Sequence, residues 1–227
     1  MEGLDNCLAL EELELYDNRI RHIENISHLT NLRFLDVSYN RIREVQGIDT
    51  LTGLTKAYLS ANRIRKMENL ATLTNLTILD VGDNKIRKIE GIDTLVNLTE
   101  FHAAKNKLIK IEGLQCLTKL QLVALQANFI QKIEGLETLV DLEELYMQQN
   151  QVKVIEGLEQ NTKLTLLDLA VNKVSKLENL EHLPELRDLW INWNNLENTP
   201  ENKEYLRCLP LTTIYLADNL MSRDDDY

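Results

Sequence analysis

The sequence predicts an α/β solenoid, in which a concave parallel β-sheet of about ten strands is backed by short helical turns on the convex side. Leucine dominates the composition, with 43 copies among 227 residues. An asparagine recurs at a strict interval of 22 residues. Before each asparagine, leucines alternate with other residues as in a half-buried strand. These observations indicate one short unit repeated along residues 1–227, which we treat as a single domain.

The strand half of each repeat has the form L-x-x-L-x-L-x-x-N, as in Leu32, Leu35, Val37 and Asn40. Successive side chains of a strand point to opposite faces, so the apolar positions face the interior and those between them face outwards. One repeat cannot bury its leucines alone, and stacked neighbours complete the core. Nine asparagines share the register, and a tenth copy follows at Asn219: Asn18, Asn40, Asn62, Asn84, Asn106, Asn128, Asn150, Asn172 and Asn194.

The other half of each repeat reads x-I-x-x-I-E-G-I/L, as in Ile86, Ile89, Gly91 and Ile92. Apolar residues three apart favour one or two turns of tight helix. Strands about 4.8 Å apart inside, with bulkier turns outside, bend the stack into a horseshoe. This pattern is the signature of leucine-rich repeats. We find no polar cap after Asp224–Asp226, so we expect the ends to lack full caps and the chain to be part of a longer protein.

The balance of acids and bases limits the classes of partner that the chain is expected to bind. With 36 acids and 25 bases, the chain has a formal net charge of −11. A protein that binds nucleic acid by neutralising phosphates needs a net positive charge, so we expect no nucleic-acid partner. We see no secretory leader at Met1 and no apolar run of about 20 residues, and we therefore expect no membrane association and a location in the cytosol or nucleus.

Acids and aromatics gather at the outward positions of the strand segments. Thirteen acids and four bases lie there, together with eight of the twelve aromatic side chains. Exposed rings beside carboxylates are typical of protein-binding surfaces, and a basic partner would suit them. The alternative is a merely solvated sheet with tyrosine as a good strand former. The aromatic set is Tyr16, Phe34, Tyr39, Tyr58, Tyr146, Trp190, Trp193 and Tyr215.

A band of lysine and arginine follows the asparagines, and a row of glutamates follows that band. Neighbouring rows of opposite sign predict exposed ion pairs, each worth about 0 to 1 kcal/mol. Contact of this band with RNA or anionic lipid is a less favoured alternative, because acids lie between the bases.

Catalytic chemistry has little support in the sequence. The four histidines and three cysteines have no metal-ligand spacing, and no nucleophile or phosphate-binding motif is present. We therefore expect no enzyme activity, metal or cofactor. The one alternative is an acid–base or metal-dependent enzyme built on Asp80 and His102, which should lie about 5 Å apart on adjacent strands.

The repeated I-E-G-L and I-E-N-L steps resemble those of the type-1 protein phosphatase regulatory subunit 7 family. The similarity is strongest over Leu142–Trp190, including Asn161 where other repeats have leucine, and the 25-residue step from Trp190 to Tyr215 matches the family spacing. The resemblance implies a monomeric, non-catalytic regulator of nucleus and cytoplasm whose concave face binds the phosphatase catalytic subunit.

The resemblance also assigns the interface. It implies contacts from Asp36, Tyr58, Asp80, His102, Asp168, Asp188, Trp190 and Tyr215, with His102 standing where the family has phenylalanine. The outward aromatics Tyr146 and Trp193 complete the predicted site. The alternative is another adaptor of the same repeat subclass, similar to an axonemal dynein light chain or a spliceosomal scaffold, that binds a different protein.

Overall fold

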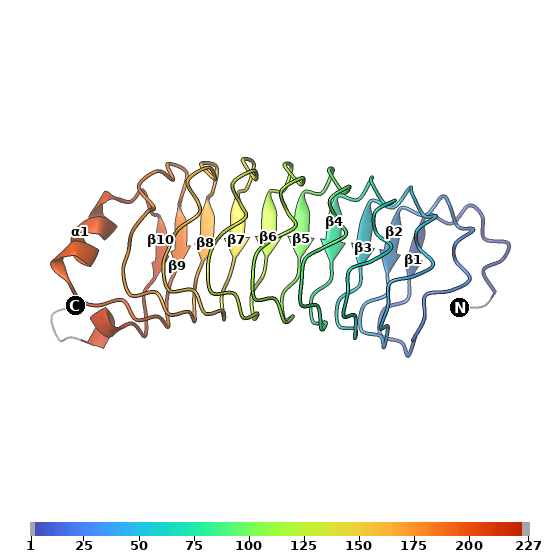
Figure 1. Cartoon of the computed structure of the whole chain (residues 1–227), viewed down its shortest axis with the longest axis horizontal. Coiled ribbons are helices and arrows are strands. Elements are labelled where there is room, and N and C mark those ends of the chain that lie inside the picture. Colours follow the sequence, from blue (N-terminus) through green and yellow to red (C-terminus); the bar gives the residue numbers. More distant parts are fainter. Residues whose placement is uncertain (1–2, 224–227) are drawn as a thin grey trace.

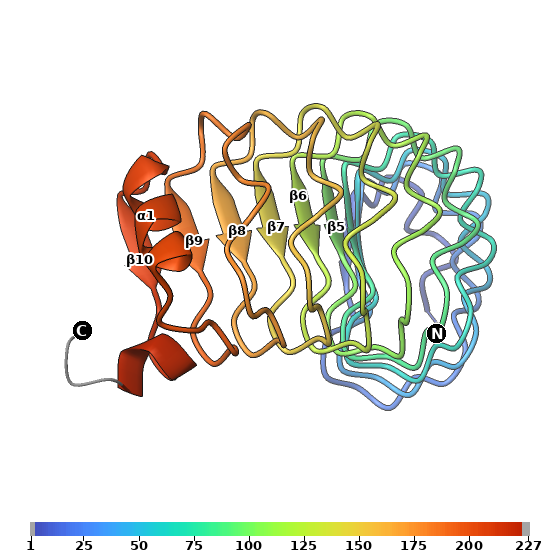
Figure 2. The ribbon, with the colours of Figure 1, turned by 60° about the vertical axis from the view of Figure 1, so that its left-hand side comes forward.

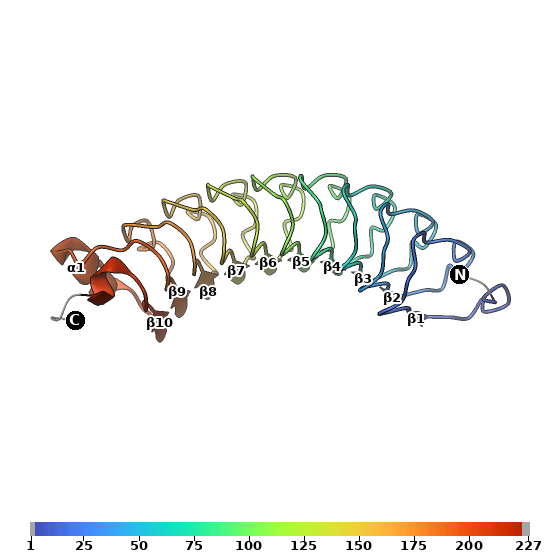
Figure 3. The same ribbon diagram turned by 90° about the horizontal axis from the view of Figure 1, so that it is seen from below.

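The computed structural model describes residues 3–223 and is an arc of stacked coils (Figures 1 and 2). The strands lie along the inner side of the arc, and the connecting turns lie outside (Figure 3). They are β1 (Glu12–Glu14), β2 (Phe34–Asp36), β3 (Lys56–Tyr58), β4 (Ile78–Asp80), β5 (Glu100–His102), β6 (Leu122–Ala124), β7 (Glu144–Tyr146), β8 (Leu166–Asp168), β9 (Asp188–Trp190) and β10 (Thr213–Tyr215). All ten pair in parallel in sequence order, which confirms the predicted sheet.

The core is a continuous column beneath the sheet. Each strand has three residues, and the middle one points inwards. In β2, Leu35 is buried between the half-exposed Phe34 and Asp36. Leu35 is in register with Ala57 of β3, which is in register with Leu79 of β4. Each large aliphatic side chain buried in this way contributes about 1.5–3 kcal/mol, so neighbouring repeats stabilise one another.

The convex side consists of tight turns. In the fourth repeat, the Leu95 N–H donates to the Ile92 carbonyl at 3.0 Å, and the Leu98 N–H donates to the Leu95 carbonyl at 2.9 Å. Both bonds have the i→i+3 spacing of a 3₁₀ turn, as the apolar spacing predicts. The turns stay separate, however, and do not join into a continuous helix.

One convex position requires a left-handed backbone. Gly91 has a φ of +70°, and a Cβ there would lie 2.8 Å from the Met67 carbonyl oxygen of the preceding repeat. Asn69 occupies the equivalent position of its own repeat with a φ of 57°. Its Nδ2 donates to the Val45 carbonyl at 2.6 Å. Asparagine tolerates this conformation and converts the close approach into a hydrogen bond, which explains why either glycine or asparagine stands at this position of a repeat.

The recurrent asparagines join successive repeats. The Asn106 Oδ1 accepts a hydrogen bond from the Ile86 N–H at 2.9 Å. Its Nδ2 lies 3.0 Å from the Val81 carbonyl of the preceding repeat and 3.2 Å from its own Ala103 carbonyl. The same bonds recur from Asn40 to Asn194, and we call these residues the asparagine ladder. Each amide therefore satisfies buried backbone groups on both sides of a repeat boundary.

The ninth repeat is closed by a helix, α1 (Pro200–Cys208), rather than by a turn. The Thr199 hydroxyl caps its first turn, and the Asn202 Oδ1 accepts from the Leu177 N–H at 2.9 Å. A 3₁₀ helix (Leu220–Arg223) follows β10 and buries Met221. The predicted absence of a cap at Asp224–Asp226 falls outside the described residues.

The ladder makes a stability prediction. Replacement of Asn106 by alanine removes the amide and leaves several buried backbone groups without a partner, so we expect a loss of about 2–4 kcal/mol in the free energy of unfolding. Urea denaturation followed by circular dichroism measures it. The matched control is Asn18→Ala, because Asn18 is exposed and its Nδ2 donates only to the Leu15 and Tyr16 carbonyls of its own repeat. Equal losses in the two variants would contradict the account.

Candidate protein-binding face

The third residue of each strand points to the concave side and is in register with its counterparts. Asp36 is paired with Tyr58, and Tyr58 with Asp80. At the other end, Asp168 is paired with Trp190, and Trp190 with Tyr215. The predicted site residues other than Asp188 and Trp193 therefore form one line, which we call the concave row: Glu14, Asp36, Tyr58, Asp80, His102, Ala124, Tyr146, Asp168, Trp190 and Tyr215.

Three aromatic rings are grouped at the C-terminal end of the concave row. The Trp190 ring stacks on Tyr215, with centroids 5.6 Å apart and an interplanar angle of 25°. On the other side, the Tyr146 ring meets Trp190 edge-on at 6.3 Å. Tyr215 is 52% exposed. We call Tyr146, Trp190 and Tyr215 the aromatic cluster, and its open side can receive a partner.

Trp193 lies beyond the end of β9, at the turn before Asn194 of the ladder. Its φ is 57°, and its side chain is 58% exposed. Tyr39 stands at the same position of the second repeat, is also exposed, and contacts Tyr16 with ring centroids 4.9 Å apart. The predicted site residue Trp193 therefore borders the concave row instead of belonging to it.

The Asp168 side chain is buried, whereas the sequence predicts that it is exposed. The outward strand position implies an exposed carboxylate, but Asp168 has 0% exposure. Its neighbours on the flanking strands are Tyr146 and Trp190, whose rings come within 6.3 Å of each other although β8 lies between their strands. The expectation of an exposed Asp168 is wrong, because large rings on both adjacent strands cover a short side chain between them.

The buried carboxylate is only partly satisfied. Its Oδ1 accepts from the Ala170 N–H at 2.9 Å. Within the described residues, neither its Oδ2 nor the indole N–H of Trp190 has a hydrogen-bond partner. Burial raises the pKa of Asp168 from 3.8 to about 6, and the bond from Ala170 opposes this rise. An ionised Asp168 therefore destabilises the folded chain, while a partner that donates a hydrogen bond to it would gain free energy.

Two other acids of the row, Asp36 and Asp80, remain half-exposed. The Asp36 Oδ1 accepts from the Ser38 N–H, and the Asp80 Oδ1 accepts from the Gly82 N–H, each at 2.8 Å. Both carboxylates thus hold the turn after their strand. Tyr58 stands between them, and its pKa is raised by burial and by the nearby charges of Glu100, Asp80 and Asp36. This end of the row is an acidic field around one phenol.

His102 makes a different contact from the one that the enzyme alternative requires. Its Nε2 lies 3.2 Å from the Glu100 Oε2, while the Asp80 carboxylate bonds to its own turn. Glu100 lies two residues before His102 on the same strand face, and its longer side chain reaches the ring. The Asp80–His102 couple of the enzyme alternative is therefore not formed. Among residues 3–223, no group of three or more histidines, cysteines or acids could hold a metal ion.

Acids also surround the aromatic cluster. The Tyr146 hydroxyl donates to the Glu144 Oε2 at 2.6 Å. Burial raises the pKa of Tyr146, with further contributions from the bond to Glu144 and from the charges of Asp168 and Asp188. Asp188 is half-buried at the start of β9, as the sequence predicts for an outward position. Sequence reasoning did not single out Glu144 or Glu100, although their spacing of two from a row residue would have indicated the contacts.

The fold and this face define a class of protein, a repeat solenoid that presents side chains from parallel strands to a partner. A model of the family described as "Leucine Rich repeats (2 copies)" matches residues 9–50, 52–94 and 140–182, which is more than half of the chain. The chain belongs to the leucine-rich-repeat family and is a scaffold suited to protein binding. None of the curated proteins matches the chain.

Solved structures share this fold. The functional domain of InlJ from Listeria monocytogenes has 22% identity and a TM-score of 0.69, covers 94% of this chain, and has 54% of its own length covered. The chain thus spans about half of that domain. Internalin C2 of the same organism has 22% identity and a TM-score of 0.72, and the match covers 92% of this chain and 82% of internalin C2. The ectodomain of the receptor kinase GASSHO1/SCHENGEN3 from Arabidopsis thaliana has 18% identity and a TM-score of 0.73. The match covers 92% of this chain and 27% of that ectodomain chain.

Within the described part of the chain, no helix is both long enough and apolar enough to span a bilayer. The alternative of a catalytic centre at Asp80 and His102 gains no support from the geometry of the described residues.

The burial of Asp168 gives a pH-dependent prediction. Its folded-state pKa lies above 3.8, so the cost of ionisation is absent near pH 4 and develops as pH rises through about 6. We expect the stability of Asp168→Asn relative to the wild type to increase by about 1–3 kcal/mol between about pH 4 and pH 8. Urea denaturation at both pH values measures this change. Asp80→Asn is the control, because Asp80 makes the same turn contact but is half-exposed. A stability difference for Asp168→Asn that is independent of pH would refute the assignment.

Proposed function

We propose that the protein is a non-catalytic regulatory scaffold that binds the catalytic subunit of type-1 protein phosphatase through its concave face. The observation that carries the proposal is the aromatic cluster, in which Trp190 contacts Tyr146 edge-on and stacks on Tyr215, with acids close to the rings. Large rings held in one conformation lose little entropy on binding, and such residues commonly supply most of the binding energy.

The resemblance to the phosphatase regulator supports the choice of partner. The residues that it assigns to the interface include Trp190 and Tyr215, which lie on adjacent strands with their rings in contact. The outward strand positions carry thirteen acids and four bases, a charge that would attract a basic surface and accelerate encounter. Binding would modulate or target the phosphatase without chemistry by the scaffold itself. We also propose a monomer in the free state and a location in nucleus and cytoplasm.

A second candidate is an adaptor of the same repeat subclass that holds another protein, as an axonemal dynein light chain or a spliceosomal scaffold does. The departure at His102 favours it, because the resemblance places phenylalanine there and the structure ties His102 to Glu100. Such an adaptor would use the concave face without requiring the phosphatase.

Binding to the purified phosphatase catalytic subunit tests the proposal. We expect Trp190→Ala to weaken the affinity by about 2 kcal/mol or more, roughly 30-fold, because it removes the centre of the stacked rings. Isothermal titration calorimetry with wild type and variant measures the change. Phe129→Ala is the matched control, because Phe129 is exposed outside the concave row and contacts Lys107. If Trp190→Ala binds as tightly as the wild type, the interface does not include the aromatic cluster. If the wild type does not bind, the second candidate is favoured.

A further inference from the structure

A second charged surface runs along the flank of the solenoid, next to the asparagine ladder. It consists of two columns of cations in the first five repeats. One column directly follows Asn18 and the first four ladder asparagines, and the other lies two residues after the first. We call the set the basic flank: Arg19, Arg41, Arg63, Lys85 and Lys107, with Arg21, Arg43, Arg65 and Arg87. All nine side chains are exposed.

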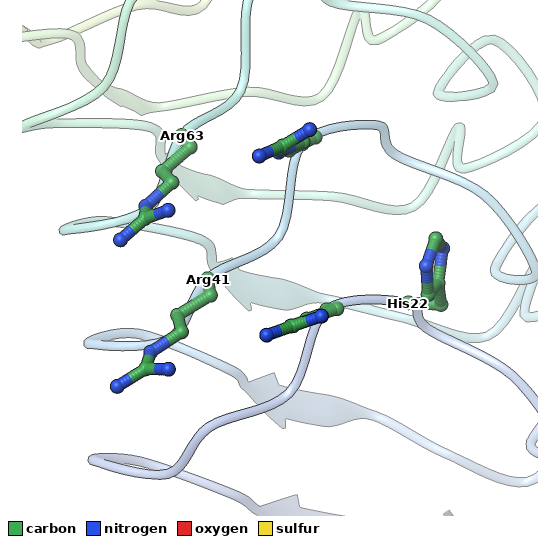
Figure 4. A pocket seen from close by; sticks show the side chains of 5 residues that line it. His22, Arg41 and Arg63 are labelled. Atoms are coloured by element: carbon green, nitrogen blue, oxygen red, sulfur yellow. The ribbon is translucent and has the colours of Figure 1, made fainter.

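Two adjoining hollows lie along the basic flank. One has a volume of about 260 Å³ and is lined by Arg21, His22, Arg41, Arg43 and Arg63. Figure 4 shows Arg41 and Arg63 extending side by side from successive repeats. The other has a volume of about 550 Å³ and is lined by Arg65, Lys85, Arg87 and Lys107. The lining of both hollows contains no acid among the described residues, so they concentrate positive charge.

The sequence predicts that the lysines and arginines after the asparagines pair with the neighbouring row of glutamates. Among the described residues, the cations that do so are lysines of a third column, four residues after the asparagine of each repeat. Lys66 lies 3.7 Å from Glu68, and Lys132 lies 3.7 Å from Glu156. Within residues 3–223, none of the nine cations of the basic flank forms an ion pair with a carboxylate. Lys107 instead lies over the Phe129 ring at 5.1 Å. The flank cations therefore repel one another without internal compensation.

The fold itself does not require these charges. In later repeats the first column holds Phe129, Gln151, Lys173 and Asn195, and the second holds Gln131, Lys153, Ser175 and Glu197. The ladder hydrogen bonds are nevertheless the same there. Cations fill nine of the ten positions of the two columns in the first five repeats and two of the eight later positions. This concentration is a surface property of this chain, and an anionic ligand would compensate it.

The chemistry of the basic flank favours a peptide over a nucleic acid. Seven of the nine cations are arginines, whose planar guanidinium groups bind carboxylates and phosphates alike in a bidentate manner, so the absence of stacking side chains decides between the two. Neither column carries an aromatic side chain in these five repeats, whereas single-stranded nucleic acids need stacking platforms.

We propose that the basic flank binds an extended acidic peptide segment of a partner protein. Five repeats at a strand spacing of about 4.8 Å span roughly 19 Å, which an extended peptide covers with about six residues. Carboxylates of that segment would enter the two hollows and bridge arginines of successive repeats. This surface is separate from the concave row and does not depend on the phosphatase proposal.

Fluorescence anisotropy with a labelled oligoglutamate peptide of about eight residues tests the proposal. We expect binding at low salt that weakens as salt rises. The triple variant Arg41→Gln, Arg43→Gln, Arg63→Gln should bind at least about tenfold more weakly, because it removes three charge-assisted contacts. All three residues are exposed, so the variant should fold, and circular dichroism checks this.

The matched control is the triple variant Lys66→Gln, Lys88→Gln, Lys132→Gln, which removes the same charge from cations already paired with glutamates. It should change the affinity by less than about twofold. Equal losses in the two triple variants, no binding of the peptide at low salt, or tighter binding of an oligouridylate RNA or of phosphatidylserine vesicles would each overturn the proposal.

Discussion

The hydrogen bonds of the asparagine ladder are the constraint on which the rest of the structure depends. A three-residue strand cannot satisfy its own backbone or bury its own leucine, so every repeat needs its neighbour. The ladder amide accepts from one repeat and donates to carbonyls of two, as Asn106 does with Ile86, Val81 and Ala103. This bonding fixes both the register of the sheet and the direction in which each outward side chain points.

The same constraint sustains an unusual backbone. The residue before each ladder asparagine is left-handed, including large side chains such as Trp193 and Val171, with φ values of 57° and 56°. This conformation costs about 1–2 kcal/mol for an L-residue with a Cβ. It persists because the following amide over-determines the turn. Bulky residues are thereby presented at the rim of the concave face, in positions that a flexible loop would not maintain.

The two charged surfaces follow from one repeat that leaves several positions free. Strand positions that face inwards are committed to the core, and the ladder positions are committed to hydrogen bonding. Outward strand positions collect acids and rings, while the two columns of the basic flank collect arginines and lysines in the first five repeats. Because a solenoid places equivalent positions in rows, a residue type that recurs at one position of the repeat forms a continuous row along the arc. A partner that meets the protein thus encounters extended rows instead of isolated residues.

The sequence by itself determined the repeat length, the ten parallel strands and the concave direction of the row from Asp36 to Tyr215, because these depend on periodicity and local backbone geometry. Only the tertiary structure decided how neighbours in that row contact one another. The rings of Tyr146 and Trp190 cover Asp168, and the His102 ring contacts Glu100 on its own strand instead of Asp80 on the neighbouring one. Such outcomes depend on side-chain length and rotamer across strands, and a one-dimensional pattern does not contain them.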